Sequence, residues 1–249
     1  MRIVGIDTAT AVASVALIEN GQLIVERTDP CQQPAPHVTG CGPKANHAEV
    51  ILPLLAGVID AAEIALGDVD GLAVSIGPGS FTGLRIGLST VKGVAYGGSI
   101  PVVGVPTLLA TAARAVHYEG LICPLLDARK RQVYAALFHK KGDTLTCLME
   151  DAVACVETVL ERISGFDAHA SYWFIGDGAK VYESLLADRF GSRARFSGDQ
   201  LSSTVAAAAA RLSERRFQHN DTDDLASLVP VYIRPPEAEL NRAVIGVTD

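Results

Sequence analysis

One order of secondary-structure patterns occurs twice along this chain, and it limits the folds that the chain can adopt. The first half predicts strands at 3–6, 13–18, 23–27, 72–76 and 102–105, with helices at 50–62 and 82–96. The second half predicts strands at 122–126, 133–138, 144–149 and 173–175, with helices at 156–164, 179–189 and 204–216. Two β-β-β-α-β-α units in tandem predict an α/β fold with two lobes, each a mixed sheet flanked by helices.

Local signals support this arrangement. Asn20-Gly21 separates two apolar runs and predicts a β-hairpin, because both residues tolerate positive φ. Asn46 and Glu49 have the spacing of a capping box before the first helix. Pro53 lies inside that helix and is predicted to kink it, because proline removes a backbone donor.

The end of the chain is predicted to return to the first lobe. A polar stretch at 219–224 has the composition of a linker, and the apolar segment 228–233 is predicted to form a closing strand. We therefore assign residues 1–105 and 222–249 to the first lobe and residues 106–221 to the second.

Charge and cysteine content exclude several classes of protein. The formal net charge is −7, so the chain by itself lacks the clustered Lys and Arg that nucleic-acid binding needs. Five cysteines without a Cys-x-x-Cys pair argue against a disulfide framework. No apolar run reaches the ~18 residues that span a bilayer, and the N-terminus lacks the pattern of a signal peptide. We expect a cytoplasmic protein without membrane contact.

A glycine-rich segment joins a predicted buried strand to a helix and reads Gly77-Pro78-Gly79-Ser80-Phe81-Thr82-Gly83-Leu84-Arg85-Ile86-Gly87. Free backbone amides at such a helix start favour anions, so phosphate binding is one interpretation. The segment lacks the Gly-Lys-Ser/Thr of a P-loop, and no acidic residue ends the next strand as in a dinucleotide site. The alternative is a tight turn with structural glycines.

The following helix carries small residues four apart, at Ser89, Gly93 and Gly97. An interior glycine costs about 1 kcal/mol relative to alanine, so another backbone is expected to approach closely. That backbone belongs either to the same lobe or to another subunit, and helical spacing does not choose between them.

These motifs together resemble the TsaB family, also called YeaZ. The resembling stretches are residues 3–8, 14–17, 47–53, 76–87, 106–108, 127–134, 176–178 and 230–234. They follow in order over nearly the whole chain, and the glycine-rich segment is the most specific of them. The resemblance implies a duplicated actin-like, ribonuclease-H-like fold and a part in synthesis of tRNA threonylcarbamoyladenosine.

The resemblance further implies a subunit without catalytic residues of its own. The paralogous TsaD-like protein would transfer the threonylcarbamoyl group, a TsaE-like ATPase would complete the set, and tRNA would be met only through the complex. The implied partner interface comprises His47, Glu49, Leu54, Arg85, Ser89, Gly93 and Gly97. The same helices would also serve in a homodimer.

Two motifs that catalytic proteins of this superfold carry are incomplete in this sequence, which agrees with a non-catalytic subunit. TsaD-type proteins hold a metal with His-x-x-x-His, whereas here Ile51 stands four residues after His47, and one imidazole does not fix a metal. The second phosphate loop of superfold kinases would lie at Asp127-Ala128-Arg129, which lacks glycine. We expect no metal and no cofactor on this chain alone, with ATP or ADP and metal on partner subunits or at the interface.

Residues of the superfold's nucleotide cleft are expected to remain as vestigial or interfacial contacts. They are Asp7, Thr8, Gly77, Gly79, Ser80, Thr82, Gly83, Gly176, Asp177 and Gly178. Two simpler interpretations stand beside this one: an Asx turn at Asp7 and a plain turn at 176–178.

Three further hypotheses stay open. Residues 29–44 carry Cys31, His37 and Cys41, either as zinc ligands or as part of a surface insertion. The chain could instead be an enzyme of the same superfold, a glycoprotease-like peptidase or a small-molecule kinase. It could also be a regulator that only forms homodimers through its glycine-rich helix.

Overall fold

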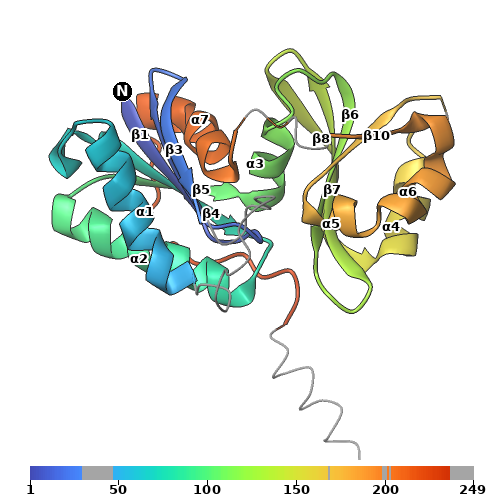
Figure 1. Ribbon diagram of the computed structural model, residues 1–249, viewed down its shortest axis with the longest axis horizontal. Coiled ribbons are helices and arrows are strands. Elements are labelled where there is room, and N and C mark those ends of the chain that lie inside the picture. The colour runs from blue at the N-terminus through green and yellow to red at the C-terminus, as the bar shows by residue number, and fades with distance from the viewer. Residues whose placement is uncertain (30–46, 168, 198–200, 202, 236–249) are drawn as a thin grey trace, which may run out of the picture.

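The computed structural model describes residues 1–29, 47–167, 169–197, 201 and 203–235. They form two lobes, each built on a five-stranded sheet (Figure 1). Residues of both lobes line a cavity between them. The segment with Cys31, His37 and Cys41 lies outside the described residues, as does the expected cap Asn46.

The first sheet has the strand order β3-β2-β1-β4-β5. Its strands are β1 (Arg2–Asp7), β2 (Ser14–Glu19), β3 (Gln22–Thr28), β4 (Gly71–Gly77) and β5 (Val102–Pro106). The first three form an antiparallel meander, whereas β4 and β5 run parallel to β1. This confirms the mixed sheet and the five strands predicted for the first lobe.

Helices cover both faces of this sheet, because side chains of each strand alternate between two cores. Val4 and Ile6 of β1 pack with Ile51 of α1 (His47–Ala61) and Val91 of α2 (Phe81–Gly98). Ile3 points to the opposite face. There it packs with Ala110 of α3 (Thr107–Ala113) and Val205 of α7 (Val205–Gln218). Helix α1 continues through Pro53.

Helix α7 lies on the first sheet, although our sequence-based division placed its residues in the second lobe. It carries five consecutive alanines, all buried, so its backbone comes close to the sheet. A β-carbon at Gly5 would lie only 2.0 Å from the carbonyl oxygen of Ala206. Glycine opposite alanine thus fixes the position of this helix, and the first lobe includes it.

The second sheet has the order β10-β9-β6-β7-β8. Its strands are β6 (Gly120–Asp127), β7 (Gln132–Lys141), β8 (Thr144–Cys155), β9 (Tyr172–Ile175) and β10 (Ala194–Phe196). The helices of this lobe are α4 (Val156–Ser164), α5 (Asp177–Val181) and α6 (Glu183–Phe190). Strand β10 and helix α3 were not predicted, and the helix expected at 179–189 is two short helices that meet at Tyr182.

The C-terminal segment returns to the first lobe but not as the predicted strand. Its described part, up to Pro235, has no strand, so the prediction for 228–233 was wrong. Single contacts attach it instead: Leu228 enters the core, and the Val231 amide donates to the Ile76 carbonyl at 2.7 Å. The predicted linker is also anchored, since Arg216 forms ion pairs with Asp221 and Asp223.

Candidate functional site

The glycine-rich segment packs against the turn that follows β1. Ser80 caps α2, accepting a hydrogen bond from the Gly83 amide at 3.2 Å, and its own amide donates to the Ala9 carbonyl at 2.8 Å. A β-carbon at Gly83 would lie 1.9 Å from the Thr8 carbonyl oxygen, and one at Gly79 would lie 2.5 Å from that of Ala9. These glycines therefore allow two backbone segments to touch, as the tight-turn interpretation proposes.

Asp7 lies at the end of β1 with no exposed surface. Its carboxylate accepts from the Ala9 amide at 3.2 Å and from the Thr10 hydroxyl at 2.5 Å. The first of these bonds is the Asx turn that the sequence allowed. Burial raises the pKa of Asp7, although its hydrogen bonds with Thr10 and Ala9 oppose the shift.

His47 begins α1 and faces the same turn. Its Nδ1 lies 3.2 Å from the Thr8 carbonyl oxygen, while Ile51, one helical turn on, is buried in the core. Glu49 is exposed, and Leu54 is partly buried against the core. The predicted interface residues of α1 thus differ in exposure. The large apolar side chain that this helix exposes is Leu52, with 54% of its surface accessible to solvent.

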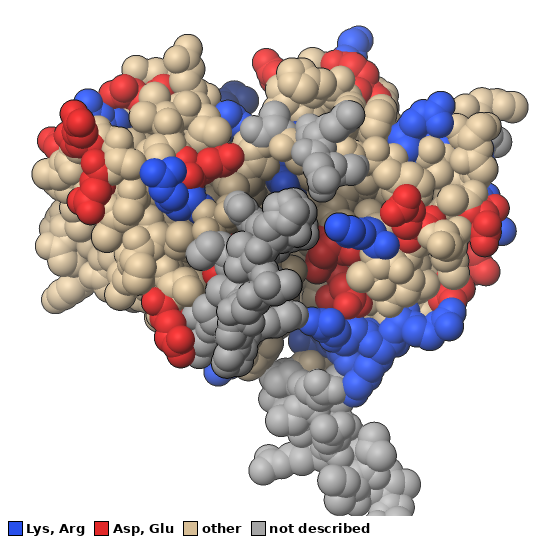
Figure 2. Space-filling model, viewed as in Figure 1, with Lys and Arg blue, Asp and Glu red and all other residues tan. Residues whose placement is uncertain are grey.

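The outward face of α2 is made of small residues with little around them. Ser89, Gly93 and Gly97 are all exposed, and apart from neighbouring residues of the helix itself, no atom of the described chain lies within 4 Å of a β-carbon built on either glycine. Tyr96 beside them is 85% exposed. Figure 2 shows few charged side chains over the C-terminal end of this helix. The structure thus places no part of the described chain against this stripe.

Arg85 lies at the other end of the predicted interface and is held by the C-terminal segment. Its Nε donates to the Tyr232 hydroxyl at 2.9 Å, and its guanidinium lies 4.2 Å from the centre of the Phe81 ring. Phe81 and Tyr232 stack with their centroids 4.7 Å apart. This cluster ties the first turn of α2 to Tyr232, which lies 147 positions further along the chain.

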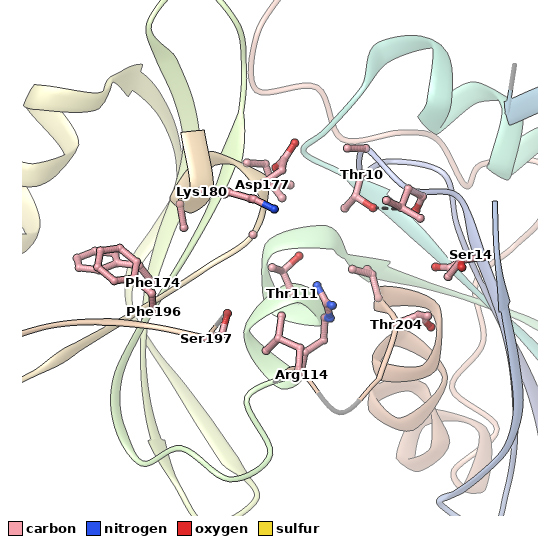
Figure 3. Close-up of a pocket in the computed structure, with 18 of the residues that line it drawn as sticks. Thr10, Ser14, Thr111, Arg114, Phe174, Asp177, Lys180, Phe196, Ser197 and Thr204 are labelled. Atoms are coloured by element: carbon pink, nitrogen blue, oxygen red, sulfur yellow. Dashed lines mark hydrogen bonds between the residues drawn. The ribbon is translucent and has the colours of Figure 1, made fainter. Parts of the chain in front are cut away.

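The two lobes face each other across a cavity of about 430 Å³ (Figure 3). Thr10 and Ser14 line it from the first lobe, and Gly176 and Asp177 line it from the second. The Asp177 carboxylate accepts from the amides of Gly178 at 3.0 Å and Asp127 at 3.3 Å. Burial is the main cause that raises the pKa of Asp177.

The structure brings together only some of the residues expected as nucleotide contacts. Gly176 and Asp177 line the cavity of Figure 3. Gly79 and Ser80 line a second hollow beside it, and Asp177 lines that hollow too. Thr8, Gly77 and Gly83 are buried. Thr82 is exposed on α2, and Gly178 is buried under a close contact with Leu125.

The turn between β6 and β7, where the sequence led us to look for a second phosphate loop, carries three basic residues and no glycine. Arg129, Lys130 and Arg131 all have positive φ, at 64°, 52° and 58°. Left-handed backbone costs a non-glycine residue roughly 1–2 kcal/mol, so this turn is strained. Arg129 pairs with Asp127 at 3.4 Å, and Arg131 pairs with Glu157.

Sequence reasoning singled out neither Arg114 nor Lys180, which both line the cavity, nor the clamp formed by Tyr232. No local motif marks these residues, because each acquires its surroundings from a distant part of the chain. Across the described ranges, no three His, Cys, Asp or Glu side chains converge as metal ligands. None of the described helices is both long and apolar enough to cross a membrane.

Comparisons with known proteins agree with this architecture. A family model described as TsaD, tRNA N6-adenosine threonylcarbamoyltransferase, matches residues 36–242. The TsaB protein of Bacillus subtilis is 30% identical over 96% of each chain, and that of Escherichia coli is 36% identical over 74% of this chain and 75% of its own. The structure of YeaZ from Pseudomonas aeruginosa has a TM-score of 0.72 and 26% identity, covering 93% of this chain and 99% of that one.

The paired sheets and the cleft between them define a two-lobed α/β protein with the duplicated actin-like fold. Within this class, the chain belongs to the TsaB (YeaZ) family, inside the wider group that the TsaD family model describes.

Proposed function

We propose that this chain is a non-catalytic subunit in the synthesis of tRNA threonylcarbamoyladenosine, and that it pairs with a TsaD-like threonylcarbamoyltransferase. Its curated relatives carry the name of this biosynthetic process, and the family model that it matches is named for the transferase. A TsaE-like ATPase completes the proposed set, and tRNA meets this chain only through the complex.

The observation that carries the proposal is the bare stripe on α2. Gly93 and Gly97 leave backbone uncovered, although interior glycines weaken a helix by about 1 kcal/mol each. Small residues let two helix backbones approach closely, so a second helix is a fitting cover. Exposed Tyr96, next to Gly97 in the sequence, would supply an aromatic contact beside it, and α1 exposes Leu52.

The surroundings of His47 support a non-catalytic role. A catalytic zinc usually has three protein ligands, and here the next position on the same helix face is Ile51, buried in the core. The strained turn at 129–131 carries long side chains where a phosphate loop would present glycine amides. We therefore expect Mg-ATP to bind this chain alone weakly or not at all.

The first test is reconstitution of threonylcarbamoyl transfer to tRNA with the cognate TsaD-like and TsaE-like proteins. We expect modification to collapse when this chain is omitted, and this chain by itself to modify no tRNA. Equal modification with and without it would sink the proposal.

A second test addresses the stripe itself. Gly93→Leu should remove pairing with the TsaD-like subunit, measured by analytical ultracentrifugation, because a leucine side chain fills the space that a partner helix needs. Lys141→Leu, at an exposed position in the second lobe, is the control and should pair normally. If Gly93→Leu bound the TsaD-like subunit as tightly as the wild-type chain does, this face of α2 would be ruled out as the interface.

Self-association is the second candidate, since the same stripe would also accept a second copy of this chain. Sedimentation of the chain alone tests it. A dimer that forms alone and persists in the presence of the TsaD-like subunit would favour the homodimeric regulator over the proposed heterodimer.

A further inference from the structure

The turn between β6 and β7 presents three consecutive basic side chains to solvent. Arg129 and Arg131 have 83% and 73% of their side-chain surface exposed, and Lys130 between them is exposed as well. Arg234 lies at the same turn, because its guanidinium donates to the Ala128 carbonyl at 2.9 Å. Figure 2 shows Lys and Arg side chains gathered at this lower end of the second lobe. The chain has 28 acidic and 21 basic residues, so this basic group departs from its overall charge.

Backbone hydrogen bonds hold this turn in place on both sides. The Ala128 amide donates to the Gln132 carbonyl at 3.0 Å, and the Gln132 amide donates to the Arg129 carbonyl at 2.9 Å. The Val156 amide, at the start of α4, donates to the Arg131 carbonyl at 3.1 Å. These bonds maintain the left-handed backbone of the turn despite its strain. A turn fixed in this way presents its side chains in set directions, so less freedom is lost when a ligand binds.

The two acids that pair with this turn do not neutralise it. Arg129 pairs with Asp127 at 3.4 Å, and Arg131 pairs with Glu157. Both arginines are largely exposed, so water screens the two pairs, and exposed ion pairs are weak. The four cations of the turn and Arg234 outnumber the two acids. A ligand with several negative charges can therefore compete for these guanidinium groups.

The chemistry of the turn fits the phosphates of a nucleic acid better than the surface of a protein. Protein interfaces have apolar and aromatic anchors at their centre, where lysine is depleted. The turn instead offers three successive cations and no apolar side chain between them. Phosphates are spaced along a polyanion, so exposed cations can each meet one without a shaped pocket. The substrate in the proposed function, a tRNA, has such a backbone.

We propose that the turn at 129–131, together with Arg234, contacts the phosphate backbone of the tRNA when this chain is part of the complex. The contact positions the substrate and reads no base. The formal net charge of −7 opposes binding by the chain alone, so the contact forms only beside the partner subunit. This inference rests on the proposed function. It adds a direct substrate contact on the lobe that does not carry the stripe on α2.

The test is the binding of labelled tRNA to the complex of this chain with the TsaD-like subunit, followed by fluorescence anisotropy at several salt concentrations. The test variant combines Arg129→Gln, Lys130→Gln and Arg131→Gln. Each lost phosphate contact lowers the slope of log affinity against log salt by about one. We expect the slope to fall by about two to three, and the affinity at low salt to fall about tenfold or more.

The matched control combines Lys141→Gln, Arg195→Gln and Arg215→Gln. It removes one lysine and two arginines, as the test variant does, from exposed positions on β7, β10 and α7. The control therefore reports the effect of net charge without a change in the turn. Glu157→Gln keeps the cations of the turn and removes the acid that pairs with Arg131, so it should tighten tRNA binding about twofold or more.

Sedimentation before tRNA is added, and a thermal melt of each variant, separate the ways in which the test can fail. If the wild-type chain forms no complex, the proposed function fails and this inference fails with it. If the complexes form but the test and control variants bind tRNA with equal affinity and salt slope, the inference alone fails. It also fails if the folded test variant loses the TsaD-like subunit, because the turn would then contact protein. Glu157→Gln decides the case if the test variant does not fold: an affinity equal to or below that of wild type overturns the inference.

Discussion

The glycines of α2 have opposite environments at the two ends of the helix. Gly83 and Gly87 press against Thr8, where a β-carbon would meet the carbonyl oxygen at 1.9 Å or the hydroxyl oxygen at 2.3 Å. Gly93 and Gly97 face open space. One residue type thus serves close packing inside the lobe at the start of the helix and leaves an uncovered surface near its end.

Alanine substitutions should separate these roles. Gly83→Ala should destabilise the chain by roughly 3 kcal/mol or more, because the clash is with backbone that has little room to move. Gly93→Ala should stabilise it by about 1 kcal/mol, as expected for an exposed helical position. Urea unfolding of both variants measures the difference, and equal effects would contradict the assignment.

The buried carboxyl of Asp7 predicts a dependence of stability on pH. Its pKa is raised above 3.8 by burial, so the folded state holds this proton more tightly than the unfolded state. The stability that this proton supplies is present below the unfolded pKa and is lost as pH rises through the folded pKa. Asp7→Asn keeps an acceptor for the Ala9 amide without the charge.

We therefore expect the stability of Asp7→Asn relative to wild type, measured as the difference in the free energy of unfolding, to increase from pH 4 to pH 7. Urea titrations at the two pH values measure this change. A relative stability that falls over the same interval would show that the carboxylate is better accommodated than its burial implies.

At the scale of elements, α2 is anchored by a segment from the far end of the chain. Tyr232 stacks on Phe81 and accepts from Arg85, so the first turn of α2 is held from outside its own helix. The opposite end of α2 carries the stripe proposed to bind a partner. The anchor therefore fixes the direction in which the stripe is presented.

Tyr232→Ala should loosen this anchor at a cost of about 1–2 kcal/mol, because it removes the stacking of Tyr232 on Phe81 and the cation–π contact of Tyr232 with Arg85. Hydrogen exchange should accelerate in the first turns of α2. Tyr232→Phe, which keeps the ring and removes the acceptor, should show a smaller effect. Unchanged exchange in the alanine variant would mean that α2 is positioned by its own packing.

At the scale of the whole molecule, the same segment connects the lobes. Leu228 lies in the first core, Val231 bonds to Ile76, and Arg234 donates to the Ala128 carbonyl of the second lobe at 2.9 Å. Helix α3 makes a second connection, because Ala110 packs in the first lobe and Leu108 in the second. The cleft is thus bounded by two connections that cross it.

Truncation after Ser227 should destabilise the chain by roughly 3–5 kcal/mol, since it removes a buried leucine and several hydrogen bonds. Truncation after Pro235 keeps all of these contacts and should unfold at nearly the same urea concentration as the full chain. Similar losses in the two truncations would assign the stabilisation to residues beyond Pro235.

The sequence by itself determined most of the order of elements, although not α3 or β10, and the mixed sheets, because apolar periodicity and turn residues report on local structure. It also allowed an Asx turn at Asp7, and it left open whether the small residues of α2 pack within their own lobe or against another subunit. Only the tertiary structure placed α7 on the first sheet, where Gly5 meets Ala206. Likewise, only the tertiary structure brought Arg114 and Lys180 into one cavity and attached Tyr232 to Arg85. These contacts join residues that no local pattern relates, and they depend on which surfaces fit together once the elements have formed.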